Sequence, residues 1–263
     1  MTNSSPSFVA SARTVATAAA KAAAQVAQAG FRSHHARSWK GDDSPVTELD
    51  EAAERVAIDI IQHAFPDHAI LAEESGSSGS HEYEWVIDPI DGTRNFTYGI
   101  PLYASAVACL HRSQVIASAI VLPEFDEVYS AEAGGGATWN DAPLSLASPP
   151  PLAQALVGFT GKRGPLLERY HAIRTALRGK IGSHRALGSS ATEFAYLAVS
   201  RLDVLIAHHP DSWDIAPGIL IATEAGARAV RYDGTPWQPG HPDLILAHPN
   251  LVPQLLDAFE KPE

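Results

Sequence analysis

The pattern of apolar and polar positions begins with two helical stretches separated by an irregular one. Residues 7–30 are dominated by alanine, contain no proline and end at a glycine, which predicts a helix. Residues 48–65 carry apolar side chains at helical spacing, with Thr47 as the N-cap and Pro66 beyond the end, and predict a second helix. Residues 31–45 show no periodicity, so we expect an exposed loop between the two helices.

Short apolar runs separated by turn residues follow the second helix. They predict the strands of one sheet, several of them joined as hairpins. The runs are Ala69–Ala72, Trp85–Ile87, Tyr103–His111, Val115–Leu122 and Glu127–Ala131.

The second half of the chain alternates strands with helices, which is the pattern of an α/β fold. We expect strands over Ala155–Thr160, Ile181–Ala186 and Val204–Ala207, and helices over Pro165–Leu177, Ala191–Ser200 and Asp214–Ala225. The clearest break in composition is Ser148–Pro151, and we place a boundary there. Residues 1–147 then form an α+β half with a mainly antiparallel sheet, and residues 148–263 an α/β half, of one compact unit.

Composition narrows the class of protein. The 263 residues include 19 Lys and Arg against 30 Asp and Glu, which gives a formal net charge of −11. This balance argues against nucleic acid or an anionic membrane as a partner, because both need basic surfaces. No apolar stretch has the length of a membrane span, and the alanine-rich beginning lacks the features of a signal peptide. We therefore expect a soluble cytoplasmic protein, in which the single cysteine, Cys109, is a buried small hydrophobe.

The most informative stretch for chemistry lies between Trp85 and Thr93. A strand delivers Asp88, a proline fixes the backbone after it, and Gly92 permits a tight turn after Asp91. Two carboxylates three positions apart across such a turn can point to one side, where their repulsion raises at least one pKa. A divalent cation relieves that repulsion, and hard oxygen ligands suit Mg²⁺. Backbone N–H groups after the turn offer a site for an anion.

Four segments of the chain resemble the inositol monophosphatase family. The stretch from Asp88 to Phe96 looks like the first family signature, and the stretch from Trp213 to Gly226 looks like the second. Glu73-Glu74-Ser75 and the residues from Pro45 to Asp50 match two further features. The four occur in family order and span most of the chain. The resemblance implies an α/β fold, an α+β sandwich with the layered αβαβα architecture of inositol monophosphatases and fructose bisphosphatases.

The resemblance also implies a phosphatase that hydrolyses a small soluble phosphate monoester, such as inositol 1-phosphate or a related sugar-alcohol phosphate, by direct attack of an activated water. Two or three Mg²⁺ ions would be held by Glu73, Asp88, Asp91, Asp214 and the main-chain carbonyl of Ile90. The implied catalytic residues are Glu73 and Thr93, with Asp50 in support. The implied substrate contacts are Asp91, Gly92, Thr93, Gly188, Ser189 and Ser190. Family members are usually homodimers that Li⁺ inhibits.

One position departs from the family. Inositol- and histidinol-phosphate enzymes usually carry a substrate-contacting glutamate seven residues before the second-signature aspartate, where this chain has Ala207. The usual contact is therefore missing, unless His208 or Asp211 substitutes. Histidinol phosphate, a 3′-phosphoadenosine-type nucleotide and fructose 1,6-bisphosphate stay open as alternative substrates. The basic residues available for a second phosphate are Arg94, Lys162 and Arg185.

Other interpretations stay open on the sequence alone. A family member can keep the metal site but lose turnover and act as a regulatory protein, or the site can hold a structural Ca²⁺. Each motif taken singly fits an ordinary turn or a helix cap. In the loop before Pro45, Trp39 is a candidate for covering the site, and Lys40 lies in a region that is mobile in relatives and can contribute a metal there. The adjacent His34 and His35 are more often exposed than metal-binding.

Overall fold

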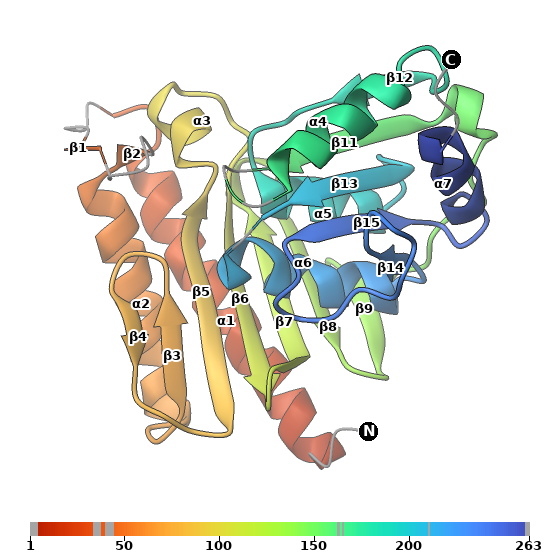
Figure 1. The fold of residues 1–263 in the computed structure, drawn as a ribbon. Helices are drawn as coiled ribbons and strands as arrows, with labels where there is room; N and C mark the ends of the chain where they lie inside the picture. Colours follow the sequence, from red (N-terminus) through yellow and green to blue (C-terminus); the bar gives the residue numbers. More distant parts are fainter. Residues whose placement is uncertain are drawn as a thin grey trace.

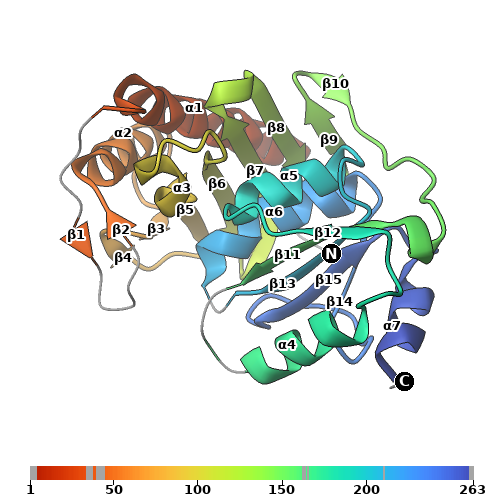
Figure 2. The same ribbon diagram turned by 90° about the horizontal axis from the view of Figure 1, so that it is seen from above.

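Two β-sheets and three layers of helices stack face to face in a computed structural model of this chain, which describes residues 5–33, 38–39, 45–161, 164, 166–209 and 211–260. Seen from above, the layers follow one another across the molecule (Figure 2). Their order is α1 (Pro6–Gly30) and α2 (Glu48–Ala64), the large sheet, α5 (Ser190–Ala198) and α6 (Ser212–Glu224), the small sheet, and α4 (Leu167–Ala176) with α7 (Val252–Glu260). The layered α/β architecture expected from the sequence is confirmed.

The large sheet has eight strands and is antiparallel except for one pair. Its strands are β3 (Ala69–Ala72), β4 (Gly76–Ser78), β5 (Tyr83–Asp91), β6 (Ala104–His111), β7 (Gln114–Leu122), β8 (Glu127–Glu132), β9 (Gly136–Trp139) and β10 (Ala142–Pro143). They lie in the order β10-β9-β8-β7-β6-β5-β3-β4, and only β3 and β5 pair in parallel (Figure 1). Strand β5 therefore runs through the sheet interior, and its carboxyl end leads into the short helix α3 (Thr93–Thr97).

The small sheet has five strands in the order β12-β11-β13-β15-β14. These are β11 (Leu156–Gly161), β12 (Ser183–Arg185), β13 (Val204–His208), β14 (Arg228–Val230) and β15 (Asp243–Ala247). Strand β11 pairs in parallel with both neighbours, and the remaining pairs are antiparallel. Successive residues of β13 face opposite sides, so Leu205 and Ala207 point to the α5 and α6 layer while Val204 and Ile206 point to α4 and α7.

Alanine makes the outer layer compact. One stripe of α1, including Ala12, Ala16, Ala19 and Ala23, is fully buried against α2 and the large sheet. Such small side chains bring the helix backbone close to its neighbours, and they lose no rotamer freedom on burial. On the opposite face of the large sheet, α5 and α6 bury larger side chains such as Phe194. Both faces of the large sheet are therefore core.

The predicted helices and strands are confirmed in order and type, with several corrections. The segment 31–45 was predicted as a loop, but it contains β1 (Ser38–Trp39), which pairs with β2 (Pro45–Val46). The strand predicted over 181–186 is shorter than expected and consists of β12 alone. Gly182 precedes it in a bend, where its N–H donates to the Ala155 carbonyl. Pattern analysis missed β4, β9, β10, β14, β15 and α7, most of which are short or follow the last motif.

The proposed boundary between two halves at residue 148 remains a prediction. The large sheet draws on residues 69–143 and the small sheet on residues 156–247, yet α6 from the second half packs on the large sheet. Within the described residues, the structure contains no helix that is both long enough and apolar enough to cross a membrane.

Candidate metal centre and active site

Strand β5 ends in the two aspartates that the sequence singles out. Both Asp88 and Asp91 lie on β5, and its pairing with β6 is interrupted by a bulge between them. Gly92 follows with φ of 87°, a conformation that side chains disfavour. A Cβ at Gly92 would lie 3.0 Å from the carbonyl oxygen of Leu102, so both the turn and the space call for glycine. The predicted turn after Asp91 is confirmed.

Helix α6 brings a third carboxylate to this turn. Oxygen atoms of Asp88, Asp91 and Asp214 all lie within 4.8 Å of one another, and all three residues are buried. Burial, together with the charge of Asp214, raises the pKa of Asp91 in spite of the hydrogen bonds it accepts. Hard oxygen donors gathered under mutual repulsion fit a divalent cation such as Mg²⁺.

The amino end of α5 holds Asp91 in place. The Ser190 hydroxyl donates to Asp91 at 2.7 Å and the Ala191 N–H at 2.8 Å, and the Ser189 hydroxyl donates to the same carboxylate. The Ser190 hydroxyl also lies 3.3 Å from Asp214. An anion at a helix amino terminus is favoured by the helix dipole. The structure therefore places the Ser189 and Ser190 hydroxyls on Asp91, while the role predicted for them in substrate contact stays a prediction.

A second carboxylate network supports Thr93. Its hydroxyl lies 2.9 Å from the Ile90 carbonyl oxygen and 3.3 Å from Asp50 Oδ1. The other oxygen of Asp50 accepts hydrogen bonds from the Thr47 N–H at 2.8 Å and the Thr47 hydroxyl at 2.7 Å. Asp50 is fully buried. Its carboxylate completes the capping box at the start of α2 and also contacts the Thr93 hydroxyl.

Glu73 is not one of the three gathered carboxylates. Its N–H donates to the Ile87 carbonyl at 3.2 Å, which fixes its backbone next to the end of β5. The turn that carries it is held by Glu54, whose carboxylate accepts from the N–H groups of Glu74 at 2.7 Å and Ser75 at 2.9 Å. Sequence analysis missed Glu54. Its signal was the spacing of four from Asp50, which places both acids on one face of α2.

The segment before α5 is tied to α3 and to a buried acid. The Asn95 side chain donates at 2.7 Å to the carbonyls of Leu102 and Leu187, and Gly188 follows with φ of 78°. Glu193 accepts from the Leu187 N–H at 2.5 Å. Burial raises the pKa of Glu193 to about 8. Sequence analysis missed this acid as well, because nothing in its local sequence marks it as buried.

Ala207, which stands where the family usually has a substrate-contacting glutamate, lies near the end of β13. Ala207 is fully buried and faces α5 and α6. The ring of His208 lies on the other side of the strand, 6.1 Å from the ring of Tyr170 on α4. His208 therefore does not point where a residue at position 207 points. Asp211, the other candidate substitute, precedes the first residue of α6.

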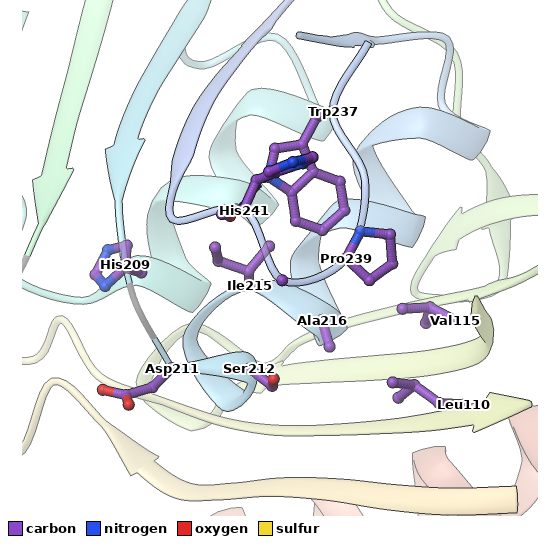
Figure 3. A pocket seen from close by; sticks show the side chains of 11 residues that line it. Leu110, Val115, His209, Asp211, Ser212, Ile215, Ala216, Trp237, Pro239 and His241 are labelled. Atoms are coloured by element: carbon purple, nitrogen blue, oxygen red, sulfur yellow. Dashed lines mark hydrogen bonds between the residues drawn. The ribbon is translucent and has the colours of Figure 1, made fainter. Parts of the chain in front are cut away.

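A small cleft adjoins the first turn of α6. Figure 3 shows His209, Asp211 and Ser212 at one end of it and Trp237 and His241 across from them. Its other lining residues include Leu110, Val115, Ile215 and Pro239. His209 lines this cleft, and its Nδ1 is 3.4 Å from Asp214 Oδ2.

Several residues named from the sequence lie outside the described part of the chain. These are His34, His35, Lys40 and Lys162, and for Trp39 only the backbone is described. Of the basic residues considered for a second phosphate, Arg185 is on the exposed edge strand β12, where its guanidinium donates to Ser183 and to the His184 carbonyl.

Comparison with known proteins agrees with this fold. The model of the inositol monophosphatase family matches residues 9–261. Among curated relatives, the inositol-1-monophosphatase of Mesorhizobium japonicum is 32% identical, with 86% of each chain covered. The Nus factor SuhB of Pasteurella multocida is 31% identical, with 94% of each covered.

Solved structures give the same result. The extragenic suppressor protein SuhB from Bartonella henselae superposes with a TM-score of 0.88 at 26% identity, covering 95% of this chain and 98% of that one. The inositol monophosphatase from Anabaena gives 0.84 at 29% identity, with 96% of each covered. Fold and family together define a phosphatase scaffold, and three of its buried carboxylates could bind a metal ion. This chain belongs to the inositol monophosphatase family.

Proposed function

We propose that this protein is a Mg²⁺-dependent phosphatase that hydrolyses a small phosphate monoester. The observation that carries the proposal is the convergence of Asp88, Asp91 and Asp214, from β5 and α6, beside a hydroxyl held by Asp50. A purely structural Ca²⁺ site needs carboxylates but has no use for an oriented hydroxyl at its edge. Family membership supports the same class of reaction.

The ligands proposed for Mg²⁺ are the three gathered carboxylates, the Ile90 carbonyl and Glu73. Mg²⁺ bound there would neutralise the carboxylates and polarise the phosphate as a Lewis acid. Two or three ions is the number we propose, because five ligand groups exceed what one ion that keeps several waters needs.

The protein groups beside the ligands have the following proposed roles. The Thr93 hydroxyl donates its proton to Ile90 or Asp50, so its oxygen is left to accept a hydrogen bond from the attacking water. Glu73 would take the proton of that water as general base. The water would attack phosphorus directly and in line, without a phosphoenzyme. The N–H groups of Gly92 and Thr93, together with Gly188, would contact the substrate.

The substrate proposed is an inositol-1-phosphate-like or related sugar-alcohol phosphate. Ala207 supplies no polar group to the alcohol part, so histidinol phosphate, fructose 1,6-bisphosphate and a 3′-phosphoadenosine-type nucleotide belong in the same test. We also propose a homodimer, on family resemblance alone.

Phosphate release tests the proposal directly. The purified protein is given inositol 1-phosphate, histidinol phosphate, fructose 1,6-bisphosphate and 3′-phosphoadenosine 5′-phosphate, each with and without Mg²⁺. We expect Mg²⁺-dependent release from at least one of them, and a loss of several orders of magnitude in Asp91→Asn. Release that does not need Mg²⁺, or that survives in Asp91→Asn, contradicts the proposal.

A regulatory protein without turnover is the second candidate. It is favoured by relatives named Nus factor SuhB, one of which is 31% identical over 94% of each chain. A protein that binds Mg²⁺ with the expected affinity but releases no phosphate from any compound of the panel would favour this candidate over the enzyme.

A further inference from the structure

The end of β13 carries a buried histidine beside a proposed metal ligand. His209 is 3% exposed, and its N–H donates to the Pro242 carbonyl at 2.9 Å, which fixes its backbone just beyond the strand. It is two residues after Ala207. Because strand residues alternate in direction, the side chain of His209 lies on the same side as that of Ala207 and opposite that of His208.

The His209 ring touches a different polar group with each nitrogen. Its Nε2 is 3.1 Å from the hydroxyl of Thr160 on β11, and its Nδ1 is 3.4 Å from Asp214 Oδ2. Thr160 is itself buried and belongs to the strand beside β13. A neutral imidazole has one donor and one acceptor nitrogen. In the tautomer in which Nε2 accepts from the Thr160 hydroxyl, the ring proton is on Nδ1, the nitrogen that lies 3.4 Å from Asp214 Oδ2 at contact distance but without hydrogen-bond geometry.

We propose that His209 is a positioning residue for Asp214, oriented by Thr160, and this inference rests on the proposed metal site. The Ser190 hydroxyl lies 3.3 Å from one Asp214 oxygen and the imidazole faces the other. Each oxygen of the Asp214 carboxylate therefore has a polar side chain within 3.4 Å. Partners of this kind behind a ligand commonly change metal affinity by about 10–100-fold when they are removed.

His209 is not proposed as a substrate contact. Its 3% exposure leaves almost no surface for a ligand to touch, whereas the family glutamate that Ala207 replaces would contact substrate. The inward side of β13 has thus lost a carboxylate and carries an imidazole directed at the metal ligand instead. The expected consequence is an effect on Mg²⁺ affinity rather than on the choice of substrate.

Two amide substitutions test the two ring nitrogens of His209 separately. In His209→Asn the amide nitrogen takes the place of Nδ1 and keeps the contact with Asp214. In His209→Gln it takes the place of Nε2 and keeps the contact with Thr160. We expect His209→Gln to weaken Mg²⁺ binding by about 10–100-fold, measured by calorimetry without substrate. We expect His209→Asn to stay within about threefold of wild type. Equal Mg²⁺ affinity in wild type and His209→Gln overturns the inference.

Further variants control for folding and for the network. His208→Gln changes the adjacent buried histidine on the other side of the strand, so it should leave Mg²⁺ affinity unchanged whatever it does to the melting temperature. Thr160→Val keeps the shape and removes the hydroxyl. It should weaken binding severalfold alone and add nothing to His209→Gln. If both His209 variants and His208→Gln lower the melting temperature alike while Mg²⁺ affinity is constant, His209 is only a packing residue and the inference fails.

The two proposals fail in distinguishable ways. Wild-type protein that binds Mg²⁺ and releases phosphate, with His209→Gln identical to it in both, defeats only the role of His209. Wild-type protein that neither binds Mg²⁺ nor releases phosphate defeats the proposed function and the role of His209 together.

Discussion

Replacing Asp214 by asparagine should separate the stability of the fold from its response to metal. The oxygens lie no more than 4.8 Å apart, so at an effective dielectric constant near 20 each fully ionised pair of carboxylates repels by roughly 3.5 kcal/mol or more. Protonation relieves part of this repulsion, in line with the raised pKa of Asp91. The opposing losses are a first-turn charge on α6, about 0.3–1 kcal/mol of helix-dipole interaction, and the charge that faces Ser190 and His209 at 3.3 and 3.4 Å. Asp214→Asn should therefore be no less stable than wild type without metal.

With Mg²⁺ bound, wild type should become more stable than Asp214→Asn. A ligand at about 100 times its Kd stabilises the native state by roughly 2.7 kcal/mol. In a domain of this size each kcal/mol moves Tm by about 2–4 °C, so wild type should gain about 5–10 °C. Asp214→Asn should gain almost nothing, because it has lost a charged ligand.

Differential scanning fluorimetry with and without saturating Mg²⁺ measures the metal-free Tm and the increase in Tm on Mg²⁺ binding for both proteins. Phosphate release from the same samples should fall by several orders of magnitude in the variant. A metal-free Tm several degrees below that of wild type would show that Asp214 stabilises the fold, and an undiminished Mg²⁺ response would show that it does not bind the ion. The first result refutes the argument from repulsion, and the second refutes the role of Asp214 as a metal ligand.

Three further predictions address the hydroxyl, a buried acid and an inhibitor. Thr93→Val should lower kcat by about 10²–10³-fold and leave the calorimetric Kd for Mg²⁺ unchanged, and an unaltered kcat would remove Thr93 from the reaction. Glu193 has a pKa raised by burial to about 8, so its contribution to stability is complete below its unfolded pKa and is lost as the pH rises towards 8. Measured by urea, the free energy of unfolding of Glu193→Gln should therefore rise relative to that of wild type between about pH 5 and 8. A constant difference between the two across that range would contradict the prediction. Millimolar Li⁺ should inhibit phosphate release, and activity indifferent to Li⁺ would point away from the inositol-phosphate branch.

Local sequence predicts the first metal motif well because its geometry is local. Asp88, Asp91 and Gly92 lie within five residues, and the strand, the bulge and the left-handed glycine follow from neighbours in the chain. The same holds for Thr47 and Asp50, which form a capping box within a single helical turn. Short-range rules act over such distances.

Contacts between residues far apart in the chain could not be predicted, because short-range rules do not extend to them. The Glu54 carboxylate accepts hydrogen bonds from Glu74 and Ser75, twenty or more residues away, and that of Glu193 is buried by the packing of α5 on the small sheet. Apart from the spacing of Glu54 from Asp50, nothing in the sequence of either helix distinguishes these acids from solvated ones. The late elements β14, β15 and α7 were missed for a different reason, since they contain no motif and their apolar runs are short.

The arrangement around Asp91 explains how a fold can tolerate a cluster of buried carboxylates. Hydrogen bonds to charged groups contribute about 1.5–3 kcal/mol each, and Asp91 accepts several from the first turn of α5. One of these donors is the Ala191 N–H, which the helix backbone fixes, and the other two are the hydroxyls of Ser189 and Ser190 at the amino end of α5. The repulsion that remains is directed at Asp214, on whose far oxygen the His209 ring lies. A change at α5 should therefore alter Mg²⁺ affinity through Asp91, and a change at His209 through Asp214, although neither segment belongs to a metal motif.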